Sequence, residues 1–380
     1  MLVLSSLLSL RIVINLQPRF VERCCVLTIS TTTRERGGPR NFGARKRILA
    51  VDAIEKSYGP NYLRFGVGLS TDFRGDSYFS IVASHRRTWI NSLGAEWRTD
   101  IQGGQTARLI SEFYQPVNTR QSIFVAPRVE LERRRVNVFQ GTNRIASYDL
   151  RRFDVAFDVG RQFTKYGEAR IGVVKGSENA SLNTGPPVLS PGLDHVSRGA
   201  LEARVLVDQL DSASFPRAGY AAALHVFASD RGLGADQNYV KAEVDGSYVW
   251  SQGPHSLNFA FKAGSNVGGN PLPRYDLFQW GGLLQQSGYS TGALMGGNLE
   301  FARAVYYYKL ARQSLLEGIY GGVSLEAGRM GAPLVPGSPT GLLKSGSLFV
   351  ALDTPVGPLY FAYGRAAAGH YAFYLYLGKP

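Results

Sequence analysis

The chain lacks long apolar runs and has almost no cysteine, and each absence excludes a class of protein. No stretch of the 380 residues approaches the roughly eighteen consecutive apolar residues that a membrane-spanning helix needs, which excludes helical spans. The two cysteines, Cys24 and Cys25, are adjacent, which is too close for an ordinary disulfide and lacks CxxC spacing. We therefore expect neither a disulfide framework nor a cysteine metal site.

Motifs of enzyme chemistry are also scarce. The five histidines are scattered without HExxH or paired metal spacing, and no convincing Walker A or dinucleotide motif is present. Gly288-Tyr-Ser290-Thr-Gly292 satisfies the G-x-S-x-G pattern of serine hydrolases, but that elbow needs a helix after the serine and a base nearby. No helix-forming stretch follows, so this context disfavours catalysis by Ser290. We predict no catalytic residue, no cofactor and no metal.

The net charge of +13 is concentrated at the N-terminus. Residues 1–47 hold nine Lys and Arg and two Glu, a net of +7, which leaves +6 for the remaining 333 residues. No stacking aromatics or recognition helix accompany this stretch, so we predict no nucleic-acid partner. The apolar start lacks a basic n-region and a small-x-small cleavage site, as a signal peptide would require. We interpret residues 1–47 as a disordered, mis-started or out-of-frame leader.

Alternation of polar and apolar residues is the main feature of the rest of the chain, from about Asn61 onward. In 239–250, for example, Val240, Ala242 and Val244 alternate with Lys241 and Glu243. A period of two indicates strands with one apolar and one wet face. The segments run roughly ten to fifteen residues, enough to cross a bilayer at a tilt and longer than most strands of soluble sandwiches. The sequence therefore predicts an all-β transmembrane barrel.

Turn signals divide residues 61–380 into sixteen candidate strands, the first at 61–72 and the last at 370–378. An even number lets the first and last strands pair antiparallel and close the sheet. The long, Pro/Gly-rich connections at 178–196 and 329–342 suit the loops of such a barrel. The connection at about 266–297 is too apolar for a free surface loop. We predict that it folds into the lumen.

Three segments resemble a known family in their order and spacing. They are Asp208-Gln-Leu-Asp211 followed by Phe215-Pro216-Arg-Ala-Gly219, the loop Gly281–Gly297, and Thr354-Pro-Val-Gly357-Pro358-Leu-Tyr-Phe-Ala-Tyr-Gly364. Together they resemble the bacterial surface antigen barrels of the outer-membrane assembly and translocation superfamily. A closer resemblance is to the barrel attached to patatin-like phospholipases of the type V secretion kind. It covers roughly 48–380 and rests on Lys56–Gly66, Trp89–Trp97 and Glu112–Pro116.

The resemblance implies a sixteen-stranded barrel at 61–380 in the bacterial outer membrane. In the full family a secreted patatin lipase domain and a polypeptide-transport-associated (POTRA) domain precede it. Residues 48–60 would supply only the last POTRA strand, and the patatin domain is missing from this chain. The implied function is translocator or anchor of the phospholipase, without catalysis of its own. The alternatives are a stand-alone barrel for protein assembly or translocation, or a gated pore.

The resemblance also implies partners. These are outer-membrane lipid and lipopolysaccharide, the barrel assembly machinery, periplasmic chaperones and an N-terminal lipase passenger. If the barrel folded in water, its lipid-facing apolar side chains would be exposed to water. Assembly factors are therefore expected of any outer-membrane barrel.

One motif departs from the superfamily pattern. There the lumenal loop carries an Arg-Gly-aromatic tip that pairs with an acidic group on the wall, whereas this chain has Gln286-Ser287-Gly288-Tyr289, with Ser at the Arg position. Glu326, just before Gly328, occupies the wall position. We predict that it accepts hydrogen bonds from the loop backbone or from Tyr289, with an ordinary lumen-facing glutamate as the alternative.

Overall fold

The computed structural model describes residues 24–33, 47–55, 61–73, 77–141, 143–163, 166–186, 195–313, 316–367, 369–378 and 380. The chain divides into two units, Met1–Tyr62 and Leu63–Pro380. Among the described residues, no helix combines the length and apolar character that a membrane span requires.

The first unit contains an antiparallel hairpin of β1 (Cys24–Thr33) and β2 (Arg47–Glu55). A strand at 24–33 differs from the disordered leader expected for 1–47, and the run Thr31-Thr32-Thr33 after Ile29 explains it, because β-branched residues favour strands. β2 overlaps the single strand expected within 48–60. The origin of the leader and the assignment to a POTRA domain stay predictions, and residues 1–23, 34–46 and 56–60 lie outside the described residues.

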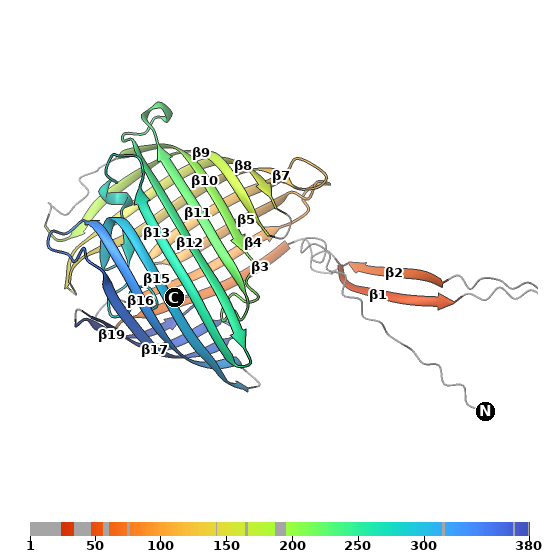
Figure 1. The fold of residues 1–380 in the computed structure, drawn as a ribbon. Coiled ribbons are helices and arrows are strands. Elements are labelled where there is room, and N and C mark those ends of the chain that lie inside the picture. Colours follow the sequence, from red (N-terminus) through yellow and green to blue (C-terminus); the bar gives the residue numbers. More distant parts are fainter. Residues whose placement is uncertain are drawn as a thin grey trace, which may run out of the picture. The chain divides into compact units, whose positions relative to one another are not determined.

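The second unit is a closed antiparallel barrel of sixteen long strands, as the sequence predicts (Figure 1). Each strand pairs with its neighbours along the chain, and the last pairs with the first. The strands are β3 (Asn61–Thr71), β4 (Ser77–Arg87), β5 (Glu96–Gly104), β6 (Thr106–Pro116), β7 (Ile123–Gln140), β8 (Asn143–Gln162), β9 (Gly167–Thr184), β10 (Val196–Asp208), β11 (Gly219–Ser229), β12 (Tyr239–Gln252), β13 (His255–Asn266), β15 (Leu294–Gln313), β16 (Leu316–Pro333), β17 (Leu343–Thr354), β18 (Gly357–Ala366) and β19 (Tyr371–Leu377).

Alternation assigns the two faces of the wall. On β8, Phe153, Val155, Phe157 and Val159 are exposed outward, while Asp154 and Asp158 between them are buried in the lumen. A lipid-facing exterior and a polar interior are what a membrane barrel needs, because water is available only inside.

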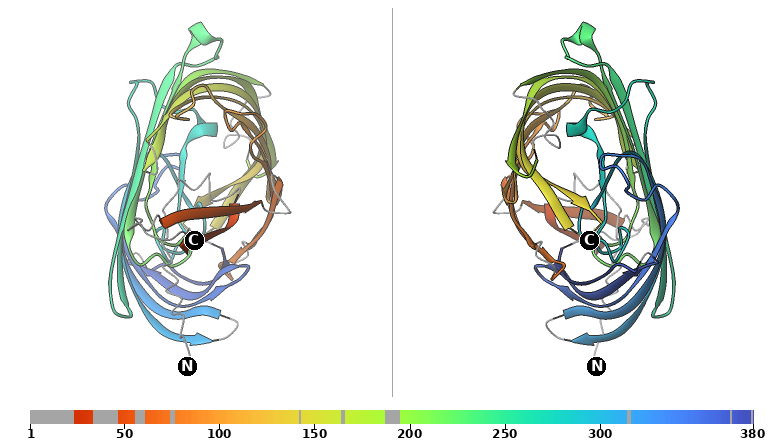
Figure 2. Two further views of the ribbon diagram at one scale, coloured as in Figure 1. Left: turned by 90° about the vertical axis from the view of Figure 1, so that its right-hand side faces the viewer. Right: turned by 90° about the vertical axis from the view of Figure 1, so that its left-hand side faces the viewer.

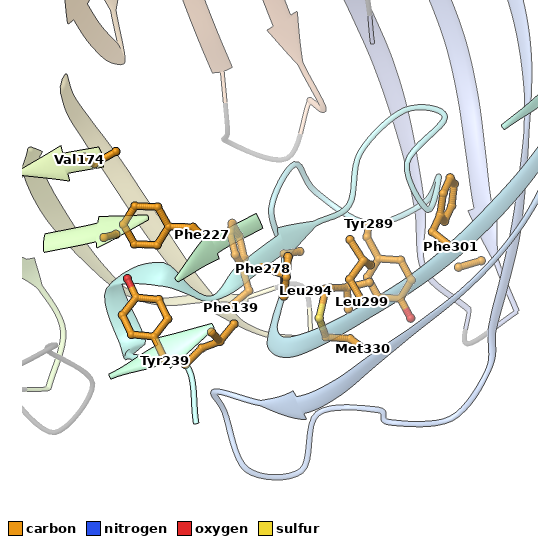
Figure 3. Close-up of a cluster of buried hydrophobic side chains, with 14 of the residues drawn as sticks. Phe139, Val174, Phe227, Tyr239, Phe278, Tyr289, Leu294, Leu299, Phe301 and Met330 are labelled. Carbon is orange, nitrogen blue, oxygen red and sulfur yellow. The ribbon is translucent and has the colours of Figure 1, made fainter. Parts of the chain in front are cut away.

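Residues 267–293, here called the lumenal loop, lie inside the ring of strands (Figure 2). The loop contains a short 3-10 turn, η3 (Arg274–Asp276), and a three-residue strand, β14 (Phe278–Trp280), that pairs with β15. The apolar side chains that made a free surface loop unlikely pack against the wall: Phe278 and Tyr289 belong to one buried cluster with Met330 (Figure 3). The loop therefore plugs part of the lumen.

Opposite charges fill the lumen beside β7 to β10. Arg128 reaches Glu202 at 2.8 Å, and the buried guanidinium of Arg198 lies 3.1 Å from Glu178. Pairing is what makes such charges tolerable away from bulk water.

The seam that closes the barrel is short. β19 and β3 share three residue pairs, Leu375–Thr71, Tyr376–Ser70 and Leu377–Leu69. The neighbouring pair β18 and β19 shares seven. Fewer ladder hydrogen bonds therefore hold this seam than hold the adjacent one.

Candidate functional site

The tip of the lumenal loop has a tight, unusual backbone. Leu284 and Gln286 have φ of 59° and 78°, and Gly288 has φ of 98°. Positive φ is uncommon outside glycine, so contacts elsewhere must hold this shape. The Ser287 hydroxyl supports it by accepting a hydrogen bond from the Leu284 N–H at 3.0 Å.

The carboxylate of Glu326, on β16, accepts five hydrogen bonds. Its Oε2 accepts the main-chain N–H groups of Gln286 at 2.8 Å and Ser287 at 2.6 Å. Its Oε1 accepts the hydroxyls of Ser287 at 2.7 Å and Ser324 at 2.6 Å. The Ser345 hydroxyl, from β17, lies 3.1 Å from Oε2. We call this set of contacts the latch, because it holds the loop tip to the wall through neutral donors.

Two wall glycines let the tip come this close. A Cβ on Gly328 would lie 2.6 Å from the Gln286 Oε1, and one on Gly364 would lie 2.8 Å from the Gly288 nitrogen. Real Cβ atoms do not tolerate such distances. The Gln286 side chain then reaches across to β17, where its Nε2 donates to the Leu343 carbonyl at 3.0 Å.

The positive charge at the latch comes from the wall. Arg303 on β15 is the register partner of Glu326 on β16, and its Nη1 donates to the Leu284 carbonyl at 2.6 Å. The loop tip is therefore held between a wall carboxylate and a wall guanidinium, while the tip itself carries no charge.

Tyr289 and Tyr374 complete the tip. The Tyr374 hydroxyl accepts the Gly288 N–H at 2.9 Å and donates to the Tyr289 carbonyl at 2.8 Å. The Tyr289 ring packs on His370 with centroids 4.7 Å apart, and burial raises the pKa of its hydroxyl. Within the described part of the chain that hydroxyl has no hydrogen-bond partner, so the Tyr289–Glu326 bond considered from the sequence is not formed.

A second anchor holds the other arm of the loop. Asp276 in η3 accepts the Tyr239 hydroxyl at 2.9 Å, and Lys241 lies 3.3 Å from its carboxylate. Burial opposes ionisation of Asp276, but Lys241, Arg152 and Arg198 together hold the pKa of its carboxyl below the usual range.

The Asp208–Gly219 motif lies in the connection from β10 to β11, at the opposite end of the barrel from the β9–β10 connection. Asp208 accepts the Leu210 N–H at 3.1 Å, and Asp211 accepts the Arg217 N–H at 2.7 Å. Gly219 has φ of 110°. These interactions shape a turn around Phe215 and Pro216.

Phe215 projects from this turn onto the lumenal wall. Its ring stacks on Tyr320 with centroids 4.1 Å apart, and the Tyr307 hydroxyl donates to the Pro216 carbonyl. Leu283 and Leu284 of the lumenal loop belong to the same buried cluster. The structure thus brings two distant motifs together inside the barrel.

The third motif divides between two places. Gly357 has φ of 122° at the turn between β17 and β18, and the Pro358 carbonyl accepts the Gly378 N–H at 2.8 Å. Gly364 of the same motif lies at the latch, as described above.

The comparisons with known proteins agree with this geometry. Residues 91–379 match the model of the Omp85 superfamily domain. The chain belongs to the Omp85 superfamily. It is accordingly a bacterial outer-membrane barrel, and the motifs described above lie largely within the matched range.

Solved structures of the same fold have little sequence identity with this Omp85 barrel. BamA from Haemophilus ducreyi lacking POTRA domains 1–3 is similar with a TM-score of 0.69 and 13% identity, over 94% of this chain and 76% of that one. CdiB from Acinetobacter baumannii gives 0.59 and 12%, over 94% and 66%. CdiB from Escherichia coli gives 0.57 and 10%, over 92% and 67%. No curated protein sequence matches the chain.

Ser290 of this Omp85 barrel is buried next to the latch. Its carbonyl accepts the Ala293 N–H at 3.0 Å, and the next element is β15. A nucleophile elbow leads into a helix, so the backbone at Ser290 has a different geometry.

Sequence reasoning missed four wall residues that contact Glu326 or the loop tip: Arg303, Ser324, Ser345 and Tyr374. Each occupies an inward position of an alternating strand, and this is the only signal that the sequence carries for them. Their convergence depends on strand register, which one sequence does not specify.

Proposed function

We propose that this barrel is the membrane-embedded translocator of a patatin-like secreted phospholipase, with the lipase as an N-terminal passenger. Membership of the Omp85 superfamily supports a role in moving polypeptides. The closer motif resemblance supports the patatin-type passenger. The observation that carries the proposal is a barrel with a plugged lumen and a short seam: the plug closes the lumen at rest, and the seam is a place where the wall can open.

The route we propose uses the seam and the latch together. Separating β19 from β3 breaks the hydrogen bonds of three residue pairs, fewer than the seven of the adjacent β18–β19 ladder. The loop tip is held by neutral donors around Glu326, so releasing it does not require separating an ion pair between tip and wall. Strand separation and loop withdrawal would then clear a path for an extended chain.

We propose that the barrel performs no chemistry itself. The inward charges of β7 to β10 are paired with one another, and the strand that follows Ser290 disfavours a nucleophile elbow there. Lipase activity of the purified chain that is lost on Ser290→Ala would contradict this proposal.

The test is to read the coding DNA upstream of Met1 and to express whatever open frame runs into Ile48. A patatin domain with its own G-x-S-x-G motif, found on the cell surface only when the barrel is present, would support the proposal. If no such domain is encoded, the phospholipase assignment fails.

A gated pore is the second candidate, and the plug is the observation that favours it. It predicts discrete conductance steps in planar bilayers that increase when the latch is broken. A translocator at rest predicts a closed barrel, so the same recordings separate the two.

A further inference from the structure

Three arginines gather on the outer face of the β7–β8 hairpin. Arg133 and Arg135 alternate outward on β7, and Arg151 is the register partner of Arg133 on β8. The Arg133 and Arg135 side chains are 56% and 46% exposed. Outward positions of a membrane barrel meet lipid, where an arginine is costly unless it reaches the interface.

Their height on the wall places them at that interface. On β8, four apolar outward residues, Phe153, Val155, Phe157 and Val159, separate Arg151 from Arg161. Ten residues at about 3.3 Å each span about 33 Å along the strand, or about 25 Å across the membrane at a tilt of about 40°. This matches the height of a barrel's apolar band, so the two arginines mark its two boundaries.

The edge of the apolar band that Arg133 and Arg151 mark is the one at the cell surface. The β7–β8 turn lies at the same barrel end as the long connections 230–238 and 267–293, whereas two-residue connections at 253–254 and 355–356 lie at the other end. Outer-membrane barrels place long loops outside and short turns in the periplasm.

The cluster has excess positive charge. Asp149 is shared by Arg133 at 3.0 Å and Arg135 at 3.1 Å. No ion pair to Arg151 is found within the part of the chain that the structure describes. Three cations around one carboxylate leave two positive charges for an external anion.

An apolar groove continues from the cluster toward the membrane centre. It has a volume of about 480 Å³ and is lined by Ile101, Leu109, Leu131 and Phe153 together with Arg133 and Arg151. Arginines bind phosphate oxygens in bidentate geometry, and the apolar floor suits an acyl chain. A single ligand with both chemistries would fill the site.

We propose that this site binds a phosphorylated, multiply acylated glycolipid of the outer leaflet, with a phosphate on Arg133 and Arg151 and an acyl chain in the groove. Charge and height together favour this occupant. Phospholipid headgroups of the inner leaflet would meet Arg161 instead, and free phosphate would leave the groove empty. The inference rests on the outer-membrane location and needs no passenger.

The test is a titration of the purified barrel with diphosphorylated lipid A, followed by native mass spectrometry. The double variant R133Q/R151Q should bind at least tenfold more weakly. R161Q is the matched control, an outward arginine of the same strand at the opposite boundary, and should bind like the wild type. Heat-modifiable migration on gels confirms that each variant is folded.

The choice of ligand distinguishes the possible sources. Dephosphorylated lipid A, phosphatidylglycerol and inorganic phosphate should each bind at least tenfold more weakly than diphosphorylated lipid A. D149N keeps the arginines and removes the competing carboxylate, so it should bind lipid A more tightly even if the double variant fails to fold. Unchanged binding by R133Q/R151Q or D149N, equal loss in R161Q, or equal binding of any of the three control ligands would overturn the proposal. Because only lipid is measured, a failure here leaves the translocator proposal standing.

Discussion

At the scale of single residues, Glu326 determines how firmly the barrel is plugged. Its buried carboxylate has lost water and is stabilised by the N–H and O–H groups around it. A hydrogen bond to a charged group contributes about 1.5–3 kcal/mol, and an unsatisfied buried partner costs about as much. The latch is therefore stable only while every donor keeps its acceptor.

Glu326→Gln should release the loop tip. The amide has one acceptor oxygen in place of two, so either the Gln286 and Ser287 N–H groups or the Ser287 and Ser324 hydroxyls lose a charged acceptor, and we expect a loss of about 2–4 kcal/mol from the closed state. Hydrogen exchange of amides 284–289, followed by mass spectrometry, should rise at least tenfold. Glu300→Gln, on the exposed outer side of β15, is the control, and equal exchange in both variants would contradict the latch.

Gly328→Ala tests the close approach directly. The new Cβ would meet the Gln286 Oε1 at 2.6 Å, so we expect the tip to shift at a cost of about 1–3 kcal/mol, again read by hydrogen exchange. Gly321→Ala on the same strand is the control, because its nearest atom, on the Leu310 side chain, is 3.6 Å away. If the loop tip exchanges its amide hydrogens equally fast in the two variants, the missing side chain of Gly328 is not what lets the tip approach the wall.

At the scale of elements, the lumenal loop is fixed at two points, by Asp276 near its start and by the latch at its tip. The two anchors differ in chemistry. Asp276 is stabilised by the charges of Lys241 and its arginine neighbours, whereas the tip carries none. The first anchor should therefore respond to salt more than the second.

Asp276→Asn should weaken the first anchor in a pH-dependent way. The pKa of Asp276 is lowered in the folded barrel, so its contribution is fully present above the unfolded value of about 3.9 and is lost as pH falls through the lower folded value. Urea unfolding in detergent, followed by tryptophan fluorescence, should show the variant less stable at pH 7. The difference should shrink below pH of about 4. A difference independent of pH would contradict the charged anchor.

Element identity is what the sequence predicts well. Period-two alternation gives all sixteen strands because each must be apolar on one side only. Strand ends are predicted less well: β9 continues to Thr184, inside the connection expected at 178–196, and β15 begins at Leu294, inside the connection expected at about 266–297. Past the membrane band the ladder continues without an apolar face, so alternation no longer marks it.

The latch could be predicted only in part. Glu326 and the tip Gln286–Tyr289 come from a motif that the sequence displays. Arg303 does not, because its position opposite Glu326 follows from the register of β15 on β16. Register depends on the stagger of the whole barrel, which no local pattern encodes.

At the scale of the whole molecule, the sheet of the barrel is closed, but its neighbouring strands share very different numbers of residue pairs. The β7–β8 ladder extends over the full length of two long strands, while β3 and β19 meet over three pairs. A closed barrel has no edge to recruit another strand, so moving a polypeptide through the wall requires opening one ladder. The β3–β19 seam is the weakest described place to do so.

The most direct measurement locks that seam and follows the passenger. Ser70 and Tyr376 are register partners, so S70C/Y376C in a C24S/C25S background can form a disulfide across it. With the upstream-encoded passenger, the oxidised variant should leave the lipase in the periplasm, and reduction should restore it to the cell surface. The matched lock T99C/S111C, between β5 and β6, should have no effect. Normal surface delivery with the seam oxidised would contradict the proposal that this barrel exports a passenger by opening there.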